Sequence, residues 1–143
     1  MRIPIEGGSA VSLASGNIYG SRYSPDGKQV AFFVDDTDKG TIATINAADG
    51  SRLKSFDLAP GGSINYNDYS LLHWSADGRA LTYPLLVGGE MNLWSQPISG
   101  GPPRQITHFH DRILAYDWSP DGKRLAITRA RSSSDVVLIS NFR

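Results

Sequence analysis

The chain contains no cysteine, which limits the chemistry that its 143 residues can perform. Disulfide bonds, thiolate zinc sites and thiol catalysis are therefore excluded for this sequence. It also lacks any run of about 18 uninterrupted apolar residues, so no transmembrane helix and no direct membrane insertion is predicted. Residues 1–14 lack the apolar core of a secretory signal peptide, which leaves a periplasmic and a cytoplasmic location both open.

An excess of charge of either sign is missing as well. Lysine and arginine together number 14, aspartate and glutamate together number 14, and the formal net charge is zero. A surface that binds nucleic acid or an anionic membrane needs a basic excess, so neither kind of partner is predicted. Helical periodicity is also missing, and apolar residues alternate or come in short runs between glycines and prolines, which indicates an all-β fold.

One short motif is present three times. It reads YSPDGK at residues 23–28, WSADGR at 74–79 and WSPDGK at 118–123, and an apolar run follows each copy. Asp26 and Asp77 are 51 residues apart, and Asp77 and Asp121 are 44 residues apart. A strand-rich repeat of roughly 40–50 residues is typical of the blades of a β-propeller. We therefore expect three four-stranded antiparallel blades, which amount to half of a propeller.

The motif has a structural explanation in a tight turn. Serine, proline and aspartate suit the first positions of a type I turn, and glycine takes the left-handed conformation that follows. We assign this role to Ser24, Asp26 and Gly27 in the first copy, to Ser75, Asp77 and Gly78 in the second, and to Ser119, Asp121 and Gly122 in the third. The recurring aspartates are thus turn residues and not a catalytic carboxylate pair.

The repeat boundaries predict one domain over residues 1–143 with three blades. Blade one covers about residues 18–58 and has strands at 19–23, 29–34, 41–46 and 53–58. Blade two covers about 66–109, with strands at 70–74, 80–86, 92–96 and 104–108. Blade three covers about 113–142, with strands at 113–118, 124–129 and 136–140, and it lacks a fourth strand. We expect residues 10–14 to supply that strand, in the same chain or in another.

The motif turns share one rim of such a meander, and the irregular loops share the opposite rim, where binding sites are usually carried. The longest loop contains Asn65, Tyr66, Asn67 and Tyr69, residue types that suit adaptable recognition of a ligand. Arg112, Arg129 and Arg131 are expected on the same rim, where a basic cluster would suit an anionic group or a peptide carboxylate. Solvated surface charge is the alternative explanation of the arginines.

Two other loop features could hold a metal ion. His108 and His110 are spaced to point the same way on a strand, but no third ligand is evident, so they are weak candidates. Asp35, Asp36 and Asp38 offer oxygen ligands without the spacing of an EF-hand. Ser132, Ser133 and Ser134 have no histidine placed to activate them and no nucleophile elbow around them. We therefore predict no enzyme activity, no resident metal and no cofactor.

The three motif copies resemble the TolB-like, or WD-type "PD", β-propeller repeat. The segments NLW at 92–94, GG at 100–101 and RQIT at 104–107 add to this resemblance, which covers essentially the whole chain. The segment from 117 to 140 also resembles the C-terminus of bacterial proteins in which such a propeller follows a serine/threonine kinase or a winged-helix regulatory domain. The resemblance implies a non-catalytic module that binds a protein or a ligand in a sensor or scaffold.

Three blades cannot close a ring, and their bare faces would expose apolar side chains. The sequence therefore predicts self-association, most simply two copies that form a six-bladed ring, or else membership of a longer propeller chain. Two other functions stay open: an accessory propeller that gates a peptidase-type hydrolase, and a purely structural assembly unit. A hydrolase domain would need about 200 further residues, which this sequence does not contain.

Overall fold

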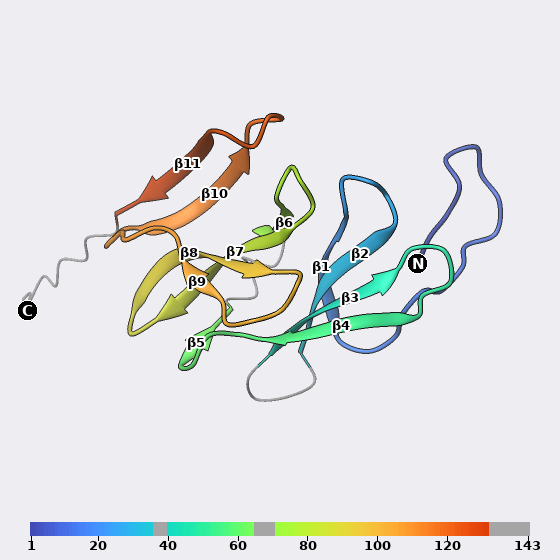
Figure 1. Ribbon diagram of the computed structural model, residues 1–143, viewed down its shortest axis with the longest axis horizontal. Coiled ribbons are helices and arrows are strands. Elements are labelled where there is room, and N and C mark those ends of the chain that lie inside the picture. The colour runs from blue at the N-terminus through green and yellow to red at the C-terminus, as the bar shows by residue number, and fades with distance from the viewer. Residues whose placement is uncertain (36–39, 65–70, 132–143) are drawn as a thin grey trace, which may run out of the picture.

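The computed structural model describes residues 1–35, 40–64 and 71–131, and these residues form strands, turns and loops without an α-helix. Figure 1 shows three antiparallel units side by side in chain order, from the blue N-terminal unit to the orange one. This is the all-β, bladed architecture that the repeat predicts. Among the described residues there is no helix long and apolar enough to cross a membrane.

Blade one is a complete four-stranded meander. Its strands are β1 (Ile18–Tyr23), β2 (Gln29–Val34), β3 (Thr41–Asn46) and β4 (Arg52–Asp57), paired in that order. The observed β2 and β3 coincide with the predicted strands, and the ends of β1 and β4 differ by one residue. Both faces of β2 are buried, which explains why its sequence is continuously apolar from Val30 to Val34.

Blade two has a first strand in two pieces. Both β5 (Gly62–Ser63) and β6 (His73–Trp74) pair with the same edge of β7 (Ala80–Val87), and only the second piece was predicted from the sequence. Glycine is required at position 62, because an added Cβ would lie 2.8 Å from Leu85 Cγ and 2.9 Å from the Ala59 carbonyl oxygen. The other edge of β7 pairs with β8 (Glu90–Pro97), which continues to β9 (Arg104–Gln105).

The last strand of blade two ends earlier than the predicted 104–108. Beyond Gln105, the Leu93 N–H donates to the Thr107 hydroxyl at 2.9 Å instead of to a backbone carbonyl. A side chain thus replaces the ladder bond that would have extended β9.

The described part of blade three consists of two paired strands, β10 (Arg112–Trp118) and β11 (Leu125–Ala130), with an irregularity between Ile113 and Ala115. The third predicted strand, at 136–140, lies outside the described residues.

The N-terminal segment lies against blade one. Arg2 and Val11 exchange two backbone hydrogen bonds, and residues 10–14 are otherwise not part of a strand. Leu13 and Ala14 pack on the apolar face formed by β2 and β3, and Gly50 lets the Leu13 carbonyl oxygen approach where a Cβ would stand. Within this chain, residues 10–14 therefore accompany blade one and do not supply the fourth strand of blade three.

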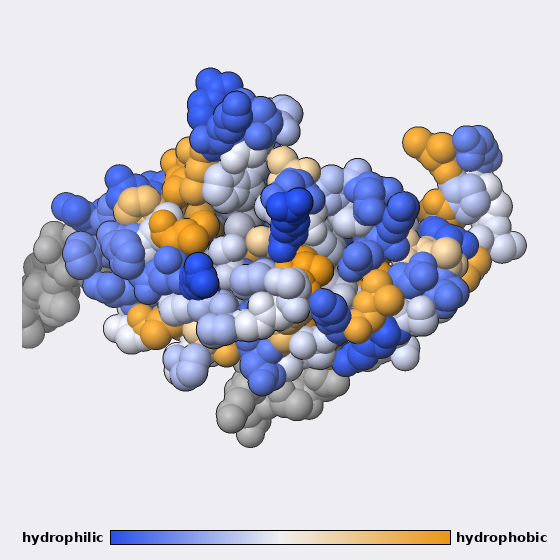
Figure 2. Space-filling model, viewed as in Figure 1, coloured by the Kyte–Doolittle hydropathy of each residue, from blue (hydrophilic) through white to orange (hydrophobic). Residues whose placement is uncertain are grey.

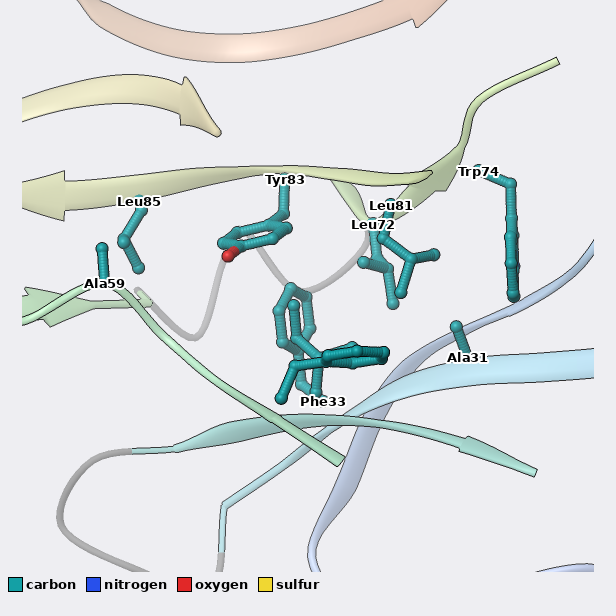
Figure 3. Close-up of a cluster of buried hydrophobic side chains, with 10 residues drawn as sticks. Ala31, Phe33, Ala59, Leu72, Trp74, Leu81, Tyr83 and Leu85 are labelled. Atoms are coloured by element: carbon teal, nitrogen blue, oxygen red, sulfur yellow. The ribbon is translucent and has the colours of Figure 1, made fainter. Parts of the chain in front are cut away.

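Apolar side chains fill the space between neighbouring blades. Phe33 of β2 meets Tyr83 of β7 edge to face, with ring centroids 6.0 Å apart, and Trp74 and Leu85 belong to the same cluster (Figure 3). A second cluster joins blade two to blade three. Burial of alternate residues from facing strands is thus what holds the blades together.

The motif turns have the predicted geometry in all three copies. The serine hydroxyl donates to the aspartate carboxylate at 2.6 Å in the first two turns and 2.5 Å in the third. The glycine that follows has a φ of 71°, 68° and 67° in turn, the left-handed region that favours this residue. The motif is therefore a scaffold element.

Candidate functional site

Loops from blades two and three meet on the rim opposite the motif turns. Glu90 is the first residue of β8, and its carboxylate lies 2.7 Å from His110 Nδ1 in the β9–β10 connection. The same connection contributes Asp111, which binds two arginines from the end of β11 and just beyond it. We call this set the charged rim cluster; it consists of Glu90, Phe109, His110, Asp111, Arg129 and Arg131.

Asp111 is the centre of the cluster. Arg131 Nε donates to Asp111 Oδ1 at 3.1 Å, and Arg129 Nη1 lies 3.4 Å from the other carboxylate oxygen. The Arg129 guanidinium also stacks over the Phe109 ring, 4.4 Å from its centroid. The Asp111 side chain is only 19% exposed, whereas the Arg131 side chain is 83% exposed. One carboxylate thus orients two guanidinium groups, and with Glu90 counted the two carboxylates of the cluster balance its two arginines in formal charge.

A buried amide holds the loop that carries this cluster. Asn92 of β8 accepts the Phe109 N–H at 2.6 Å and the Thr107 hydroxyl at 3.0 Å, and its NH₂ group donates to the Phe109 carbonyl at 3.3 Å. Asn92 is 2% exposed, so these bonds replace water that the amide has lost. Asn92 therefore fixes the position of Phe109 and of the adjoining His110 and Asp111.

A shallow pocket of about 310 Å³ adjoins the cluster. Its lining combines apolar residues with charged ones: Leu86, Gly89, Met91, His110, Asp111, Arg112, Ala130 and Arg131. An apolar floor with charged groups at its edge suits a ligand that has both an aliphatic part and a charged group.

The structure places the three predicted arginines in one region, but two of them pair with a carboxylate of the protein itself, which the sequence did not lead us to expect. Arg112 opens β10 and lines the pocket, while Arg129 and Arg131 share Asp111. The expected basic cluster is thus partly neutralised by a carboxylate. The other predicted ligand residues, Asn65, Tyr66, Asn67 and Tyr69, lie outside the described residues, as do Asp36, Asp38 and Ser132 to Ser134.

The two histidines considered as metal ligands have separate partners. His108 Nδ1 lies 3.2 Å from Gln105 Nε2, whereas His110 pairs with Glu90. Both follow the end of β9, so the strand spacing that would align them does not apply. Within the described ranges, no group of three histidine or acidic side chains is placed to hold a metal ion.

A third histidine lies between the first strands of neighbouring blades. The His73 ring is 4.8 Å from the Tyr116 ring, and its Nδ1 is 3.6 Å from the Asp117 carboxylate. Burial lowers the pKa of His73 below 6.5, and the positive charge of Arg22 adds to this, against the opposing effect of Asp117. Burial therefore favours the neutral form of the His73 ring.

The motif aspartates are committed to their turns. Asp26, Asp77 and Asp121 each have a lowered pKa, first because the serine hydroxyl donates to the carboxylate and second because a backbone N–H two residues on does so. In each turn both of these bonds go to the Oδ1 oxygen of the aspartate, which agrees with a structural role.

Sequence reasoning did not identify three residues that shape the site. They are Glu90 and Asp111, which were not singled out from the sequence, and Asn92, which was considered only as part of the strand at 92–96. The one available signal was Asp111 beside the two histidines, because an acidic residue in a loop of basic ones often pairs with them. Nothing in the sequence pointed to Asn92, whose partners lie 15 and 17 residues away.

Sequence comparison finds two kinds of longer protein to which parts of the chain are similar. No family model matches it. It is 31% identical over 122 residues to Dipeptidyl-peptidase 5 of Porphyromonas endodontalis, a match that covers 81% of this chain and 17% of that protein. It is 34% identical over 62 residues to Tol-Pal system protein TolB of Francisella tularensis, covering 43% of this chain and 14% of that protein. The chain therefore spans less than a fifth of either relative.

Solved structures agree on the fold. Putative TolB from Agrobacterium tumefaciens superposes with a TM-score of 0.69 at 18% identity, covering 90% of this chain and 44% of that one. TolB from Acinetobacter baumannii gives 0.63 at 19% identity, covering 81% and 27%. The acylaminoacyl peptidase of Pyrococcus horikoshii gives 0.59 at 17% identity, covering 90% and 20%. The antiparallel blades, the repeated Asp-Gly turns and these superpositions together show that the chain has a TolB-like β-propeller fold.

Proposed function

We propose that this chain is a non-catalytic β-propeller module that binds an acidic peptide or small ligand at the charged rim cluster, as the sensor or scaffold part of a bacterial regulatory protein. The relatives that it matches are bacterial and several times longer, which is consistent with a module that serves a larger protein. The chemistry of the rim indicates what such a module would recognise.

The paired arginines on Asp111 are the observation that carries this proposal. Arg131 presents its guanidinium to solvent, and Asp111 already holds one edge of that group in place. The Arg131 side chain therefore loses little conformational entropy when a ligand carboxylate binds to it. The pocket beside it offers Leu86 and Met91 to an aliphatic part of the ligand. An acidic residue next to an apolar one in a peptide has this combination of groups.

The surroundings of the histidines and of the motif aspartates favour binding over catalysis. In the described ranges, the His73, His108 and His110 rings pair with carboxylate or amide groups and not with a hydroxyl. One oxygen of each motif carboxylate, Oδ1, accepts the hydrogen bonds of its own turn. A nucleophile needs an adjacent base. The three histidines and the motif aspartates, which are the candidate bases, have other partners.

Fluorescence anisotropy with a labelled pair of peptides tests the proposal. One peptide carries a Leu-Glu pair and the other carries Leu-Gln at the same position. The chain should bind the glutamate peptide more tightly, and the Arg131→Ala variant should lose about tenfold in affinity, which corresponds to one charge-assisted hydrogen bond. Added salt should weaken binding of the glutamate peptide because the arginine is exposed.

Arg124→Ala is the matched control, since Arg124 is an exposed arginine beside a motif turn on the opposite rim. It should leave the affinity unchanged. Equal binding of both peptides, or equal losses in the two arginine variants, would contradict recognition at the charged rim cluster.

A second candidate function is the propeller of a peptidase. It is favoured by the likeness to Dipeptidyl-peptidase 5 and to an acylaminoacyl peptidase, although the second of these supports only the fold. The coding sequence around this segment tests it: a hydrolase domain with a Gly-x-Ser-x-Gly nucleophile elbow in the same reading frame would support this function, and an adjoining kinase or winged-helix domain would support the regulatory role.

A further inference from the structure

Of the three histidines in the chain, His110 is the one that belongs to the charged rim cluster. His73 lies in the junction between blades two and three, and the His108 ring lies beside Gln105. His110 Nδ1 instead lies 2.7 Å from Glu90 Oε1. The side chains of His110 and Glu90 are 86% and 51% exposed, so water reaches the pair. His110 can therefore exchange a proton with solvent while it stays beside Glu90.

The contact with Glu90 determines which ring nitrogen of His110 can change its protonation. A carboxylate only accepts hydrogen bonds, so the Nδ1 atom that faces Glu90 carries the hydrogen. The hydrogen bond made by one nitrogen of a histidine ring sets the state of the other. Nε2 is therefore the atom of His110 that binds or releases a proton, and the ring changes charge there without breaking its bond to Glu90.

The other charges of the cluster balance each other. Glu90 and Asp111 are acidic, and Asp111 pairs with both Arg129 and Arg131. The formal charge of the cluster is therefore zero when His110 is neutral, and it is positive when His110 is protonated. Histidine is the side chain that ordinarily changes charge between about pH 5 and pH 8. The charge that a ligand meets at this rim thus follows the protonation of one ring.

Charged residues from several elements share the pocket edge with His110. Arg112 opens β10, Arg131 follows β11, and Asp111 adjoins His110 in the same connection. Glu90 approaches from β8. Figure 2 shows hydrophilic residues at the surface where β10 begins and β11 ends, at the left of the molecule. By residue type, arginine and the acidic residues keep their charge near neutral pH, so the histidine is the member of this set that changes it.

We propose that protonation of His110 regulates the charged rim cluster, so that it holds its acidic ligand more tightly as the pH falls from about 8 to about 5.5. This inference rests on the proposed function, because it concerns the same ligand and the same pocket. The neutral ring leaves the Glu90 carboxylate to repel a ligand carboxylate that is bound to Arg131. The protonated ring offsets that repulsion. An anionic ligand and a proton therefore favour each other's binding.

The size of the effect follows from Coulomb's law. His110 and Arg131 line one pocket of about 310 Å³, so the ring lies close to a ligand carboxylate that Arg131 holds. A unit charge about 6 Å from another in a water-like medium changes an equilibrium constant about threefold. Because His110 and Glu90 are exposed, added salt should screen this contribution.

Fluorescence anisotropy at pH 8 and at pH 5.5, in low salt, tests the proposal with the Leu-Glu and Leu-Gln peptides. The termini of both peptides are blocked, because a free α-amino group would itself titrate in this range. The affinity of the unmodified chain for the glutamate peptide should rise about threefold on acidification, and that for the glutamine peptide should stay constant. His110→Gln should bind the glutamate peptide equally at both pH values.

His108→Gln is the matched control. His108 is an exposed histidine in the same connection, but its ring lies beside Gln105 and outside the charged rim cluster. This variant should keep the threefold rise. A constant affinity in the unmodified chain, an equal rise in His110→Gln, or loss of the rise in His108→Gln would overturn the proposal, while a preference for the glutamate peptide would still support the proposed function. Failure of both peptides to bind at either pH would overturn the two together.

A second measurement needs no ligand. Long-range proton–nitrogen NMR of the free chain at pH 8 distinguishes the two neutral tautomers of a histidine ring. His110 should carry its hydrogen on Nδ1, and Glu90→Ala should lose this preference, because the carboxylate that fixes it is gone. A His110 ring with its hydrogen on Nε2 in the unmodified chain would overturn the proposal, whatever the peptides do.

Discussion

The Trp118 indole nitrogen lies 3.0 Å from the Thr82 hydroxyl oxygen, so a hydrogen bond crosses the junction between blades two and three. The same hydroxyl lies 3.1 Å from the Tyr116 hydroxyl, which also donates to the Leu71 carbonyl at 2.8 Å. Apolar burial brings the two blades together, and these bonds determine their register.

Trp118→Phe should lower the free energy of unfolding by about 1 kcal/mol, because it removes one hydrogen bond and keeps most of the apolar contact. Urea unfolding measures the change. Trp94→Phe is its control, since the buried Trp94 indole nitrogen has no hydrogen-bond partner in the described structure. That variant should be neutral or slightly more stable, and an equal loss in both would contradict a role for the Trp118 bond.

Tyr83 and Tyr116 provide a second matched pair. Burial raises the pKa of both hydroxyls, so both stay neutral, but only Tyr116 has hydrogen-bond partners, and the Tyr83 hydroxyl has none among the described residues. Tyr116→Phe should therefore destabilise the fold by about 1–2 kcal/mol, whereas Tyr83→Phe should stabilise it or leave it unchanged. Thermal unfolding of the two variants distinguishes these outcomes; a larger loss in Tyr83→Phe would refute the assignment.

Removal of the amide that supports the charged rim cluster should affect both stability and binding. Asn92→Ala leaves the Phe109 N–H without its acceptor, and we expect a loss of about 2–3 kcal/mol. Affinity for the glutamate peptide should fall as well, because Phe109 and Asp111 lose their position. Asn46→Ala removes a single turn bond to the Ala48 N–H and should cost less than about 1 kcal/mol.

The His73 environment predicts a dependence of stability on pH. Burial lowers the folded-state pKa below the ordinary 6.5, so the unfolded chain binds this proton more readily than the folded one. The contribution of His73 is fully present above pH 6.5 and is lost as the pH falls through the folded-state pKa. In urea unfolding between pH 8 and pH 5, the unmodified chain should lose more stability than His73→Gln. Parallel pH profiles would show that His73 is not responsible.

Much of the fold could be predicted from the repeat. The first blade was predicted strand by strand because its strands are continuous and its turns are short, so periodicity and turn chemistry determine the result. The second blade was less predictable. Its first strand is split into β5 and β6. Its last strand, β9, ends where the Thr107 and Asn92 side chains form hydrogen bonds. Neither feature leaves a periodic signal in the sequence.

The site was predicted less completely than the fold. The alternation of rims correctly brought Arg112, Arg129 and Arg131 to one region, because a meander places its loops by connectivity alone. The net charge of that region depends on Asp111, because its carboxylate pairs with Arg129 and Arg131 and offsets part of their positive charge. A contact between residues 18 to 20 positions apart depends on how the blades pack, and a single sequence carries no direct signal of it.

The sequence alone determined the local structure of this protein: three Asp-Gly turns with serine-bound carboxylates, short antiparallel strands and an arrangement in blades. Those features depend on interactions within a few residues, which residue type and spacing specify. The tertiary structure alone decided that Trp74 and Trp118 reach back to the preceding blade and that Leu13 and Ala14 lie on blade one. Those features depend on packing between distant strands, where shape and burial select the partner.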